Sequence, residues 1–570
     1  MEEKNNDDEV LDLDEEKQEE TVPEEPTKEI SDVVVTEPTN DTVMSPEEPN
    51  DKKPDDKKKK KSKKGLLTVL ICLVIIGILA ACYVVFFAKP EEKIKKTDTK
   101  EVKSPYRLSG NGLENFDLYF LQLENEAKNK VYSPLSIKYA LQMLSEGSAG
   151  ETKKQIDDVI GDYEAKKYVN SKHMSFANAM FIRDTFKDAV KESYVTKLKE
   201  NYDAEIRYED FSSVQPMNEW VSEKTFKLIK DMFDDVSEDN FILINALAID
   251  MNWKNRIQAA NAPLPEGMKQ LYYHVNYVHE KYSDYIHIIE DDYPSMKFNN
   301  QENIKSVEVG ASFNHYDIVK DKGENNIRKT VTDDYTKYLN ENPEAVEYCP
   351  PVDEYVNQYI KDINTNYKEA AISTDFYISD NDNVKVFAKD LQTYDGTTLQ
   401  YVGIMPKNEE LTTYVKNLKV KDLTKILESL KEVKYDNFKE GVITQIRGNI
   451  PLFKYEYELK LVKDLNKLNI KDAFKPGKAD LTGMIEDSEQ YIGDASHKAM
   501  IEFSNDGIKA AAATAISGFG AAGACNYDYE FDVPIEKIDI TFDKPYMYII
   551  RDKNSGEVWF TGTVYEPIKK

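Results

Sequence analysis

The feature that most constrains this chain is an uncharged stretch that directly follows a run of lysines. Nine lysines lie between Lys52 and Lys64, and no Asp, Glu, Lys or Arg occurs from Gly65 to Ala88. Leu66 to Ala88 counts 23 residues. As a helix these residues would extend roughly 35 Å, which is enough to cross the hydrocarbon layer of a membrane. We therefore expect a transmembrane helix over residues 65–88 rather than a buried core helix.

The lysines also predict an orientation. Positive charge before the span favours an N-terminus in the cytoplasm and export of the C-terminal part. A cleaved signal peptide is disfavoured, because the apolar stretch is long and follows a tail of more than sixty residues. One alternative stays open: Leu79-Ala80-Ala81-Cys82 resembles a bacterial lipobox, in which Cys82 would become a lipidated N-terminus. We expect a single-pass protein of the cell membrane, with its C-terminal part extracellular.

The regions beside the span differ in composition. Residues 1–64 are acidic and then Lys-rich, and residues 1–51 contain no aromatic side chain, so they cannot bury enough apolar surface to offset the entropy of ordering. We expect a disordered cytoplasmic tail there. Residues 89–108 are charged and contain Ser104-Pro105, which is typical of a juxtamembrane stalk. Residues 109–570 remain as the folded part.

Charge and cysteine content exclude some classes of protein. The formal net charge of −29 argues against nucleic acid as a partner, because binding to phosphates needs a basic surface. Of the four cysteines, only Cys349 and Cys525 lie beyond the span, so the chain has no disulfide framework. Whether these two cysteines pair is left open, because pairing depends on their separation in space.

Periodic segments in the exported part predict a mixture of helices and strands. Apolar residues recur at helical spacing from Leu113 to Leu123, and Ser133-Pro134 opens a second helical segment. Further helix-like segments cover 186–201 and 217–233. Strand-like apolar runs cover 241–249, 399–405, 541–550 and 558–564. Because many of the strands come late, we expect an α+β fold with large β-sheets.

Several motifs, in a fixed order, resemble the serpin family, whose members are serine protease inhibitors. The segment from Asn129 to Gln155 contains Ser-Pro-Leu-Ser-Ile and a Gly-x-x-Gly-x-Thr turn, and is the most specific match. The match continues at 176–181, 218–221, 243–246, 252–254, 450–454, 479–483, 496–502, 542–546, 550–552 and 562–564. The resemblance covers about 105–260 and 383–569. It implies a serpin fold with large β-sheets, about nine helices and an exposed reactive-centre loop.

Between the two matching regions the chain is about ninety residues longer than the family pattern. The extra residues are rich in Tyr, Asp, Asn and Glu. We expect an insertion within about 260–375.

The resemblance places the reactive-centre loop after Gly507. In this family the cleaved loop inserts into a sheet as a new strand, so alternate side chains must be suited to the interior. Ile508, Ala510, Ala512, Thr514 and Ile516 form one uncharged alternate set, while Lys509 belongs to the opposite set. A charge or a proline in the inward set would oppose insertion. The expected loop hinge is Gly507, Ile508, Ala510, Ala511, Ala512, Ala513 and Thr514. Ile508 replaces the small residue usual there, and Asn505 replaces an acidic one.

Counting from Gly507 places the reactive-centre bond between Ala521 and Ala522. A small residue there suits elastase-like or subtilisin-like serine proteases, which have small specificity pockets. The loop is about a dozen residues longer than usual before Phe542, so Phe519, Cys525 or Tyr527 are alternatives for the cleaved position.

The resemblance also implies a set of residues that control opening of the sheet: Ser133, Ser136, Asn245, His497 and Trp253. A satisfied structural hydrogen-bond network, or core packing for Trp253, is the simpler interpretation of the same residues.

A site for catalysis or metal is not predicted. His274, His279 and His287 lie close together in sequence, but His279-Glu280 lacks the second histidine at the spacing of a zinc protease. No phosphate-binding loop, dinucleotide fingerprint or Gly-x-Ser-x-Gly elbow occurs. We expect no cofactor, no metal and no enzyme activity.

Together these features predict a membrane-anchored extracellular serpin that inhibits serine proteases by a suicide mechanism. The alternative is a non-inhibitory surface binding or adhesion protein that uses the insertion at 260–375. Abundant Asn, Lys and Tyr, with the long cytoplasmic tail, hint at a bacterial source.

Overall fold

The computed structural model describes residues 104–255, 257, 295–365, 370–371, 375–379, 381–486, 489–493, 495–505, 507–508, 525, 527, 529 and 531–570. The expected tail at 1–64, span at 65–88 and nearly all of the stalk lie outside these residues. Within the part that is described, no helix combines the length and the apolar character needed to cross a bilayer. The described residues belong to one compact unit, Thr99–Lys570.

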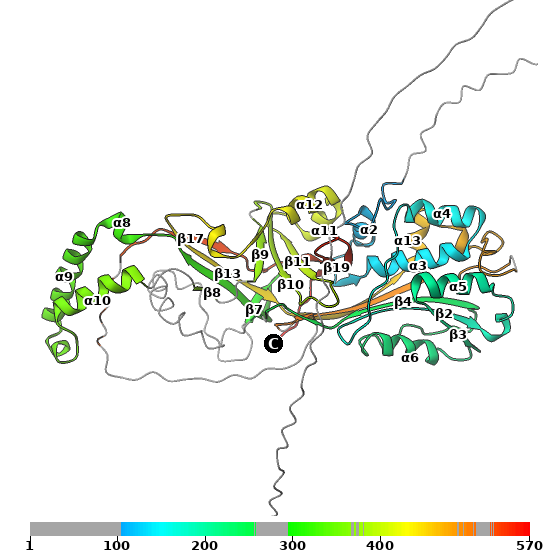
Figure 1. The fold of residues 1–570 in the computed structure, drawn as a ribbon, viewed down its shortest axis with the longest axis horizontal. Helices are drawn as coiled ribbons and strands as arrows, with labels where there is room; N and C mark the ends of the chain where they lie inside the picture. Colours follow the sequence, from blue (N-terminus) through cyan, green and yellow to red (C-terminus); the bar gives the residue numbers. More distant parts are fainter. Residues whose placement is uncertain are drawn as a thin grey trace, which may run out of the picture. The chain divides into compact units, whose positions relative to one another are not determined.

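A seven-stranded sheet forms the centre of this unit (Figure 1). Its strands, in spatial order, are β1 (Lys130–Tyr132), β19 (Val558–Val564), β18 (Tyr546–Asp552), β11 (Leu399–Pro406), β10 (Val384–Asp390), β9 (Phe376–Ser379) and β12 (Leu430–Glu432). Every residue of β11 and β19 is buried. Both strands are therefore covered on both faces, which explains why they read in the sequence as continuous apolar runs.

A second sheet orders its strands as β17 (Ile535–Asp539), β13 (Ile443–Pro451), β7 (Gln301–Asn314) and β6 (Ser295–Phe298), with β8 (Ala370–Ala371) paired to β7. The turn between β6 and β7 uses Asn299 and Asn300, both with positive φ (45° and 64°). Asparagine tolerates this conformation, and such a turn matches the twist of a hairpin. Strands β6 and β7 thus lie in a regular sheet, although their sequence falls inside the stretch expected to be inserted.

Two further sheets meet where β4 (Phe241–Ile249) is followed along the chain by β5 (Met251–Asn252). The first has the order β3 (Glu205–Glu209), β2 (Met174–Arg183) and β4. The second has the order β14 (Phe453–Lys460), β15 (Ser496–Phe503), β16 (Gly507–Ile508) and β5. Only one residue separates β4 from β5. The two sheets are therefore continuous at that point.

Helices cover these sheets. They are α2 (Asn115–Leu123), α3 (Pro134–Gly147), α4 (Gly150–Ile160), α5 (Glu192–Tyr202), α6 (Gln215–Lys224), α11 (Leu411–Asn417), α12 (Val420–Glu428) and α13 (Leu461–Lys467). Helices α3 and α5 lie on one face of the β3-β2-β4 sheet and α6 on the other (Figure 1). Helix α3 begins at Pro134, after Ser133 caps it by accepting a hydrogen bond from the Ser136 amide at 3.0 Å.

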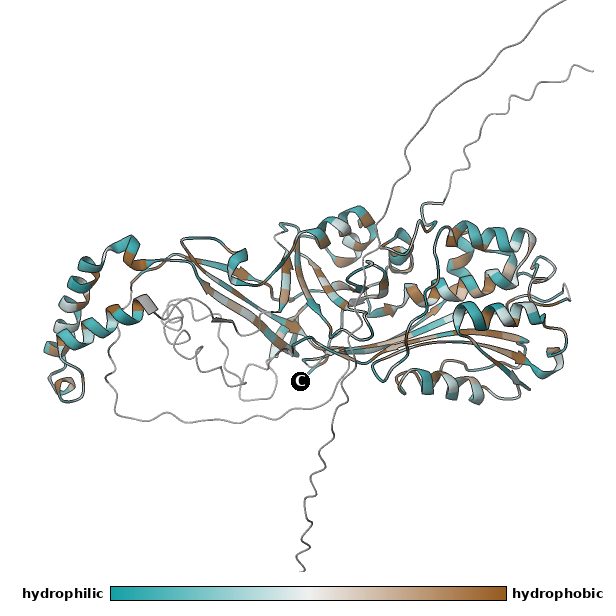
Figure 2. Ribbon diagram, in the orientation of Figure 1, coloured by the Kyte–Doolittle hydropathy of each residue, from teal (hydrophilic) through white to brown (hydrophobic). Residues whose placement is uncertain are grey.

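A separate helical hairpin follows β7. It comprises α8 (Ile318–Lys322), α9 (Glu324–Glu341), a short 3-10 turn (Pro343–Glu347) and α10 (Val352–Thr365). Ile327, Val331, Val356 and Ile360 form a small core of its own. Figure 2 shows hydrophobic and hydrophilic stretches alternating along α9 and α10, as expected for amphipathic helices.

The α+β class is confirmed, but the expected number of helices is too low. Eleven α-helices occur in the described residues, against about nine expected, and three of them belong to the hairpin. The segment at 217–233 is helical only in α6, which ends at Lys224. Phe226 and Lys227 follow with positive φ (52° and 63°), which ends the helix.

Candidate functional site

The first two residues of the expected hinge form a strand in the sheet. Ile508 pairs with Met251 of β5 on one side and with Phe503 of β15 on the other, and Gly507 pairs with Asn252. The chain reverses tightly between β15 and β16, where the Ser504 amide donates to the Gly507 carbonyl at 3.1 Å. Strand β16 is therefore the element that joins β15 to β5.

Glycine is required at position 507 because of close packing. A Cβ atom there would lie 2.2 Å from the Met251 carbonyl oxygen and 2.6 Å from the Asn252 Cα. Backbone atoms cannot yield by such an amount, so any side chain would push β16 away from β5. The requirement comes from the approach of the neighbouring strand.

Ile508 turns its side chain into the interior. It is 2% exposed, and its neighbours Met251 and Phe503 are 0% and 1% exposed. Ile508, the first residue of the uncharged alternate set, therefore faces the interior. The other alternate positions, Ala510, Ala512, Thr514 and Ile516, lie outside the described residues, as do Ala511 and Ala513.

Beyond Ile508 the sheet is parted. Among the described residues, no ladder pairs β4 with β15. The two strands belong to the β3-β2-β4 sheet and the β14-β15-β16-β5 sheet, and β16 is the only described strand between β15 and β5. A cavity of about 10 Å³ lies in the gap, lined by Ile249 of β4, by Met500 and Ile501 of β15 and by Ile508. This volume is roughly what one water molecule needs. Lys498 of β15 donates to the Asp231 carbonyl at 2.8 Å, so the segment after α6 crosses the gap.

Ser133 and His497 meet beneath β15. The Ser133 amide donates to Nε2 of His497 at 2.9 Å, while the Ser133 hydroxyl caps α3. His497 is 7% exposed. Loss of hydration lowers the pKa of His497 to about 4. The ring is therefore neutral near pH 7, as an acceptor nitrogen requires.

Asn245 is held in a different group. Its Nδ2 donates to Oδ1 of Asn178 on β2 at 2.7 Å, and Asn178 donates to the Tyr202 carbonyl at 2.7 Å. The structure therefore links Ser133, Ser136 and His497 by hydrogen bonds, but it does not bring Asn245 into that set. Within the described part of the chain, the buried Ser136 hydroxyl and Asn245 Oδ1 have no hydrogen-bond partner.

Trp253 lies at the hinge end of the gap. Its indole Nε1 donates to the Ser504 carbonyl at 2.9 Å, and its ring meets Phe503 edge-on at 5.4 Å between centroids. The residue is 1% exposed. Trp253 therefore holds the reversal from which β16 begins, which gives it a packing role and a hinge role at once.

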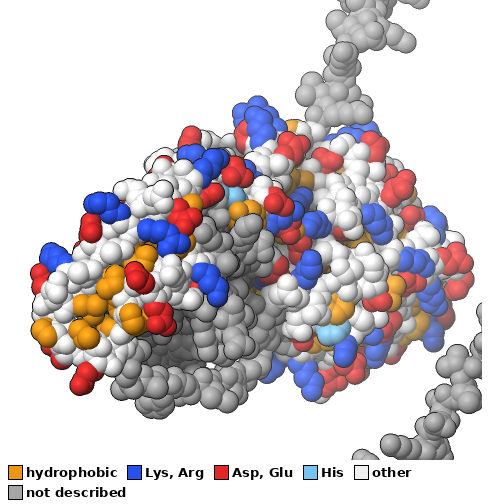
Figure 3. Space-filling model, turned by 60° about the vertical axis from the view of Figure 1, so that its left-hand side comes forward, with side chains coloured by type: hydrophobic (Ala, Val, Ile, Leu, Met, Phe, Trp, Pro, Cys, Tyr) orange, Lys and Arg blue, Asp and Glu red, His pale blue; other side chains and the backbone are white. Residues whose placement is uncertain are grey.

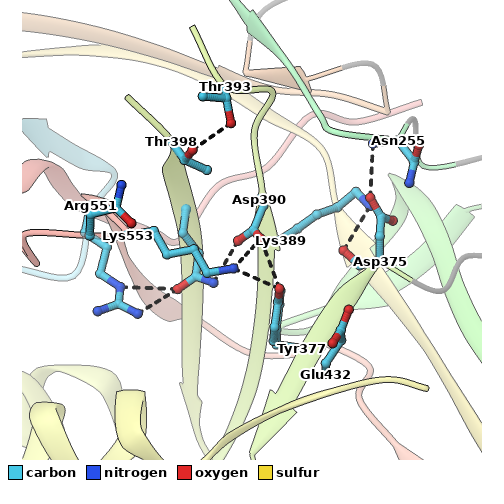
Figure 4. A network of polar contacts seen from close by, with 12 residues as sticks. Asn255, Asp375, Tyr377, Lys389, Asp390, Thr393, Thr398, Glu432, Arg551 and Lys553 are labelled. Carbon is cyan, nitrogen blue, oxygen red and sulfur yellow. Dashed lines mark hydrogen bonds and ion pairs between the residues drawn. The ribbon is translucent and has the colours of Figure 1, made fainter. Parts of the chain in front are cut away.

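Polar residues that the sequence did not indicate support the chain after Trp253 (Figure 4). The Asn255 amide donates to Asp375 at 3.0 Å, and Asp375 forms an ion pair with the fully buried Lys389. Burial lowers the pKa of Lys389. The neighbouring Asp390 accepts from Lys553 at 2.6 Å. Together they tie the segment after β5 to β10.

Further contacts complete this network. Asp390 also accepts from the Tyr377 hydroxyl at 3.0 Å and from Gln400 at 2.9 Å, and Gln400 accepts from Arg551 at 2.9 Å. Buried polar groups of this kind fix one geometry when each is paired. No sequence pattern predicts them, because the partners come from β9, β10, β11 and the end of β18.

The distal end of the expected loop is fixed by the helical hairpin. Cys525 forms a disulfide with Cys349, which follows the 3-10 turn of the hairpin. The Tyr527 ring packs at a tilt against the rings of Tyr335 and Tyr338, each 4.7 Å away between centroids. The Tyr359 hydroxyl donates to the Tyr529 carbonyl at 2.7 Å. Alternate residues from 525 to 531 thus face the hairpin, as in a strand.

These contacts bear on the cleaved position. The side chain of Cys525 is bonded to Cys349, and the Tyr527 ring packs against two tyrosine rings, with its hydroxyl donating to Asp334 at 2.6 Å. Neither can enter a protease specificity pocket in this arrangement. Phe519, Ala521 and Ala522 lie outside the described residues. So do His274, His279 and His287, while the described residues contain no cluster of three or more metal-binding side chains.

Comparisons with known proteins bear on this arrangement. A family model described as serpin (serine protease inhibitor) matches residues 115–263 and 363–567. The unmatched residues between these ranges include β6, β7, α8 and α9. The leukocyte elastase inhibitor of Xenopus tropicalis is 23% identical over 478 residues, which cover 80% of this chain and 97% of that protein.

Solved structures show the same fold. The native state of tengpin, a thermophilic serpin, has a TM-score of 0.52 and 19% identity, and the match covers 81% of this chain and 96% of tengpin. Thyroxine-binding globulin in complex with thyroxine has a TM-score of 0.51 and 17% identity, covering 80% and 97%.

Acidification should weaken the fold through His497. Its folded pKa is depressed from 6.5 to about 4, so the unfolded chain binds more protons between these values. The contribution is full above pH 6.5 and is lost as the pH falls toward 4. We expect His497 to account for about 2 kcal/mol of unfolding free energy lost between pH 7 and pH 5. Denaturant unfolding of parent and His497→Gln at both pH values measures it.

His173→Gln is the matched control, because His173 contacts the Asp250 carbonyl and not Ser133. The control should keep the pH dependence of the parent, whereas His497→Gln should lose most of it. Equal pH dependence in the parent and in His497→Gln would show that the buried imidazole is not the titrating group.

Replacing Ile508 by glutamate should expel β16 from the sheet, since an unpaired charge in this interior is strongly unfavourable. We expect amide exchange at Met251, Asn252 and Ile508 to accelerate at least 100-fold by hydrogen-exchange mass spectrometry. Ile508→Val, which keeps an apolar β-branched side chain, should change exchange less than tenfold. Parent-like protection in Ile508→Glu would mean that the inward side chain does not hold the strand.

Proposed function

Because the chain belongs to the serpin family, we propose that it inhibits serine proteases by a suicide mechanism in which the loop after β16 is the bait. The observation that carries this proposal is the parted sheet with Gly507 and Ile508 already placed as a strand at one end of the gap. A cleaved loop would extend this strand from residues that already lie in the sheet.

The length and pattern of the loop fit the gap. Strand β4 has nine residues and β15 has eight, so about eight residues beyond Ile508 would run the length of the gap. In that length the inward positions, in phase with Ile508, are Ala510, Ala512, Thr514 and Ile516. All are uncharged and none is proline. Each could pack beneath the sheet while its backbone pairs with both neighbours.

The chemistry would follow from this insertion. The protease serine attacks the Ala521 carbonyl, the bond to Ala522 breaks, and the new amino group at Ala522 leaves with a proton. The carbonyl carbon of Ala521 stays bonded to the serine oxygen. If the loop inserts before water attacks this ester, the enzyme is carried along the gap and held as an acyl-enzyme. The native state would be held by a kinetic barrier.

Two observations support a cut at Ala521–Ala522. The competing positions Cys525 and Tyr527 are held by the hairpin, and one relative is named leukocyte elastase inhibitor. A small residue suits an elastase-like or subtilisin-like pocket. The chain itself would bring no catalytic group to the reaction.

We also propose that the inhibitor is held outside the cell by residues 65–88. The uncharged stretch after the lysines supports this anchor. The disulfide between Cys349 and Cys525 favours an oxidising compartment, because cytosolic thiols are kept reduced.

A second candidate is a non-inhibitory binding or adhesion protein that uses the helical hairpin. The hairpin has a core of its own and exposes large apolar side chains, which favours a contact surface. In that case the loop would be cut by proteases without trapping them.

A protease panel decides between these candidates. The full chain in mild detergent is incubated with elastase-, subtilisin-, chymotrypsin- and trypsin-like enzymes and examined by denaturing gel and intact mass. We expect a covalent complex with an elastase- or subtilisin-like enzyme. Without reductant the fragment from Ala522 to Lys570 should stay attached through Cys525, and with reductant it should separate. Cleavage without a complex would favour the second candidate.

A matched pair of loop variants checks the inward phase in the same assay. Ala512→Arg places a charge in the inward set, so insertion should slow and the moles of inhibitor consumed per mole of enzyme trapped should rise at least tenfold. Ala511→Arg adds the same charge on the outward set and should change this ratio less than twofold. Equal ratios for both variants would contradict insertion in phase with Ile508.

A further inference from the structure

The turn of the helical hairpin exposes apolar side chains. Among the described residues four large apolar side chains are conspicuously exposed, and two of them are Val346 at 61% and Tyr348 at 50%. Both lie within three residues of Cys349. Figure 3 shows hydrophobic side chains gathered on the hairpin. The other two, Val169 and Tyr491, lie in loops before β2 and β15.

This turn is rigidly built. The amides of Tyr348 and Cys349 both donate to the Ala345 carbonyl, at 3.2 and 2.8 Å, and Ala345 is fully buried. The Tyr335 hydroxyl donates to the Pro350 carbonyl at 2.8 Å. Val346 and Tyr348 are therefore presented to solvent by a fixed turn.

Acidic residues border the same turn. Glu344 and Glu347 lie in the 3-10 turn, and Asp353 and Glu354 begin α10, all with exposed side chains. The surface is thus apolar at its centre and negative at its rim. A complementary partner would present apolar side chains flanked by Lys or Arg.

The disulfide brings the reactive loop to this surface. Ala522 precedes Cys525 by three residues, a length of at most about 11 Å of extended chain. A protease domain of about 220 residues has a radius of gyration of roughly 17 Å. An enzyme that cuts the Ala521–Ala522 bond is therefore held with its cleft within about 11 Å of Cys525, and the tether is shorter than the enzyme's own radius, so the hairpin turn lies within reach of the enzyme surface.

We propose that Val346 and Tyr348 form an exosite, a second contact surface beside the reactive loop, for the target protease. The exosite would meet the enzyme beside the part of its cleft that holds residues after the cut, and would select enzymes that are apolar and basic there. This inference rests on the proposed function. It adds a determinant of target choice that the residue at the cut does not provide.

The test measures the second-order rate constant for loop cleavage or complex formation by an enzyme of the panel that cuts the full-length protein. Val346→Ser combined with Tyr348→Ser should lower this constant at least tenfold, with an unchanged melting temperature because both residues are exposed. Val169→Ser combined with Tyr491→Ser removes the other exposed pair and should change it less than twofold. Raising the salt concentration should slow the parent.

Removal of the Cys349–Cys525 disulfide distinguishes loss of the exosite from a general loss of structure. In a Cys349→Ser, Cys525→Ser background the loop loses its covalent tether, and its nearest described contact with the hairpin is then at Tyr527. The two serine substitutions at 346 and 348 should therefore lower the rate constant by a smaller factor than in the tethered protein. A parent-like rate for the Val346 and Tyr348 variant in the tethered protein overturns the exosite.

The two proposals fail in different ways. Loop cleavage without a covalent complex contradicts inhibition, while the cleavage rate constant still reports on the exosite. A covalent complex that forms equally fast with the hairpin variant supports inhibition and overturns the exosite. A loop that no enzyme of the panel cuts overturns both.

Discussion

The close contact between Gly507 and the backbone of Met251 is the interaction on which the site depends. Because no side chain intervenes, β16 fits between β5 and β15 and directs Ile508 inward. The Trp253 indole supports this junction by donating to the Ser504 carbonyl at the chain reversal. The network around Lys389 supports the chain that follows Trp253. Beyond the junction, no ladder joins β4 to β15 among the described residues, so each of these two strands pairs with other neighbours there.

The same loop is fixed at its other end by a different element. The hairpin contacts Cys525, Tyr527 and Phe531 through a disulfide, packed tyrosine rings and a cation–π contact of Lys322 with the Phe531 ring. Under the proposed mechanism, a cut between Ile508 and Cys525 would release the part that inserts from the part that stays with the hairpin. Insertion would then require cleavage, because the described ends of the loop are held in the sheet and on the hairpin.

Part of this arrangement could be predicted from the sequence. The motif from Asn129 to Gln155 and the segment at His497 were enough to place Ser133 beneath β15, because they carry a family pattern. Cys525, Tyr527, Tyr529 and Phe531 alternate with polar residues in the sequence, a pattern that was not used to predict a strand-like segment with one face covered. It could not reveal what covers that face, because the covering helices lie in the insertion.

Other features depend on contacts between distant segments. Cys349 and Cys525 are 176 residues apart, and no local pattern tells that their Cα atoms approach to 4.7 Å. The pair of Lys389 and Asp375 joins β10 to the residue before β9, and a buried lysine reads in sequence as an ordinary strand residue. The two-residue strand β16 is too short for any periodicity, so only the partners Met251 and Phe503 reveal it.

The central claim is that the gap beside β16 accepts the cleaved loop as a strand, and thermal unfolding before and after a single cut tests it most directly. Eight residues paired on both sides would add on the order of 10 kcal/mol of hydrogen bonding and packing. For a folded part of this size we expect the melting temperature of the cleaved protein to rise by about 10 °C or more. An unchanged or lower melting temperature after complete cleavage between Ile508 and Cys525 would contradict the claim.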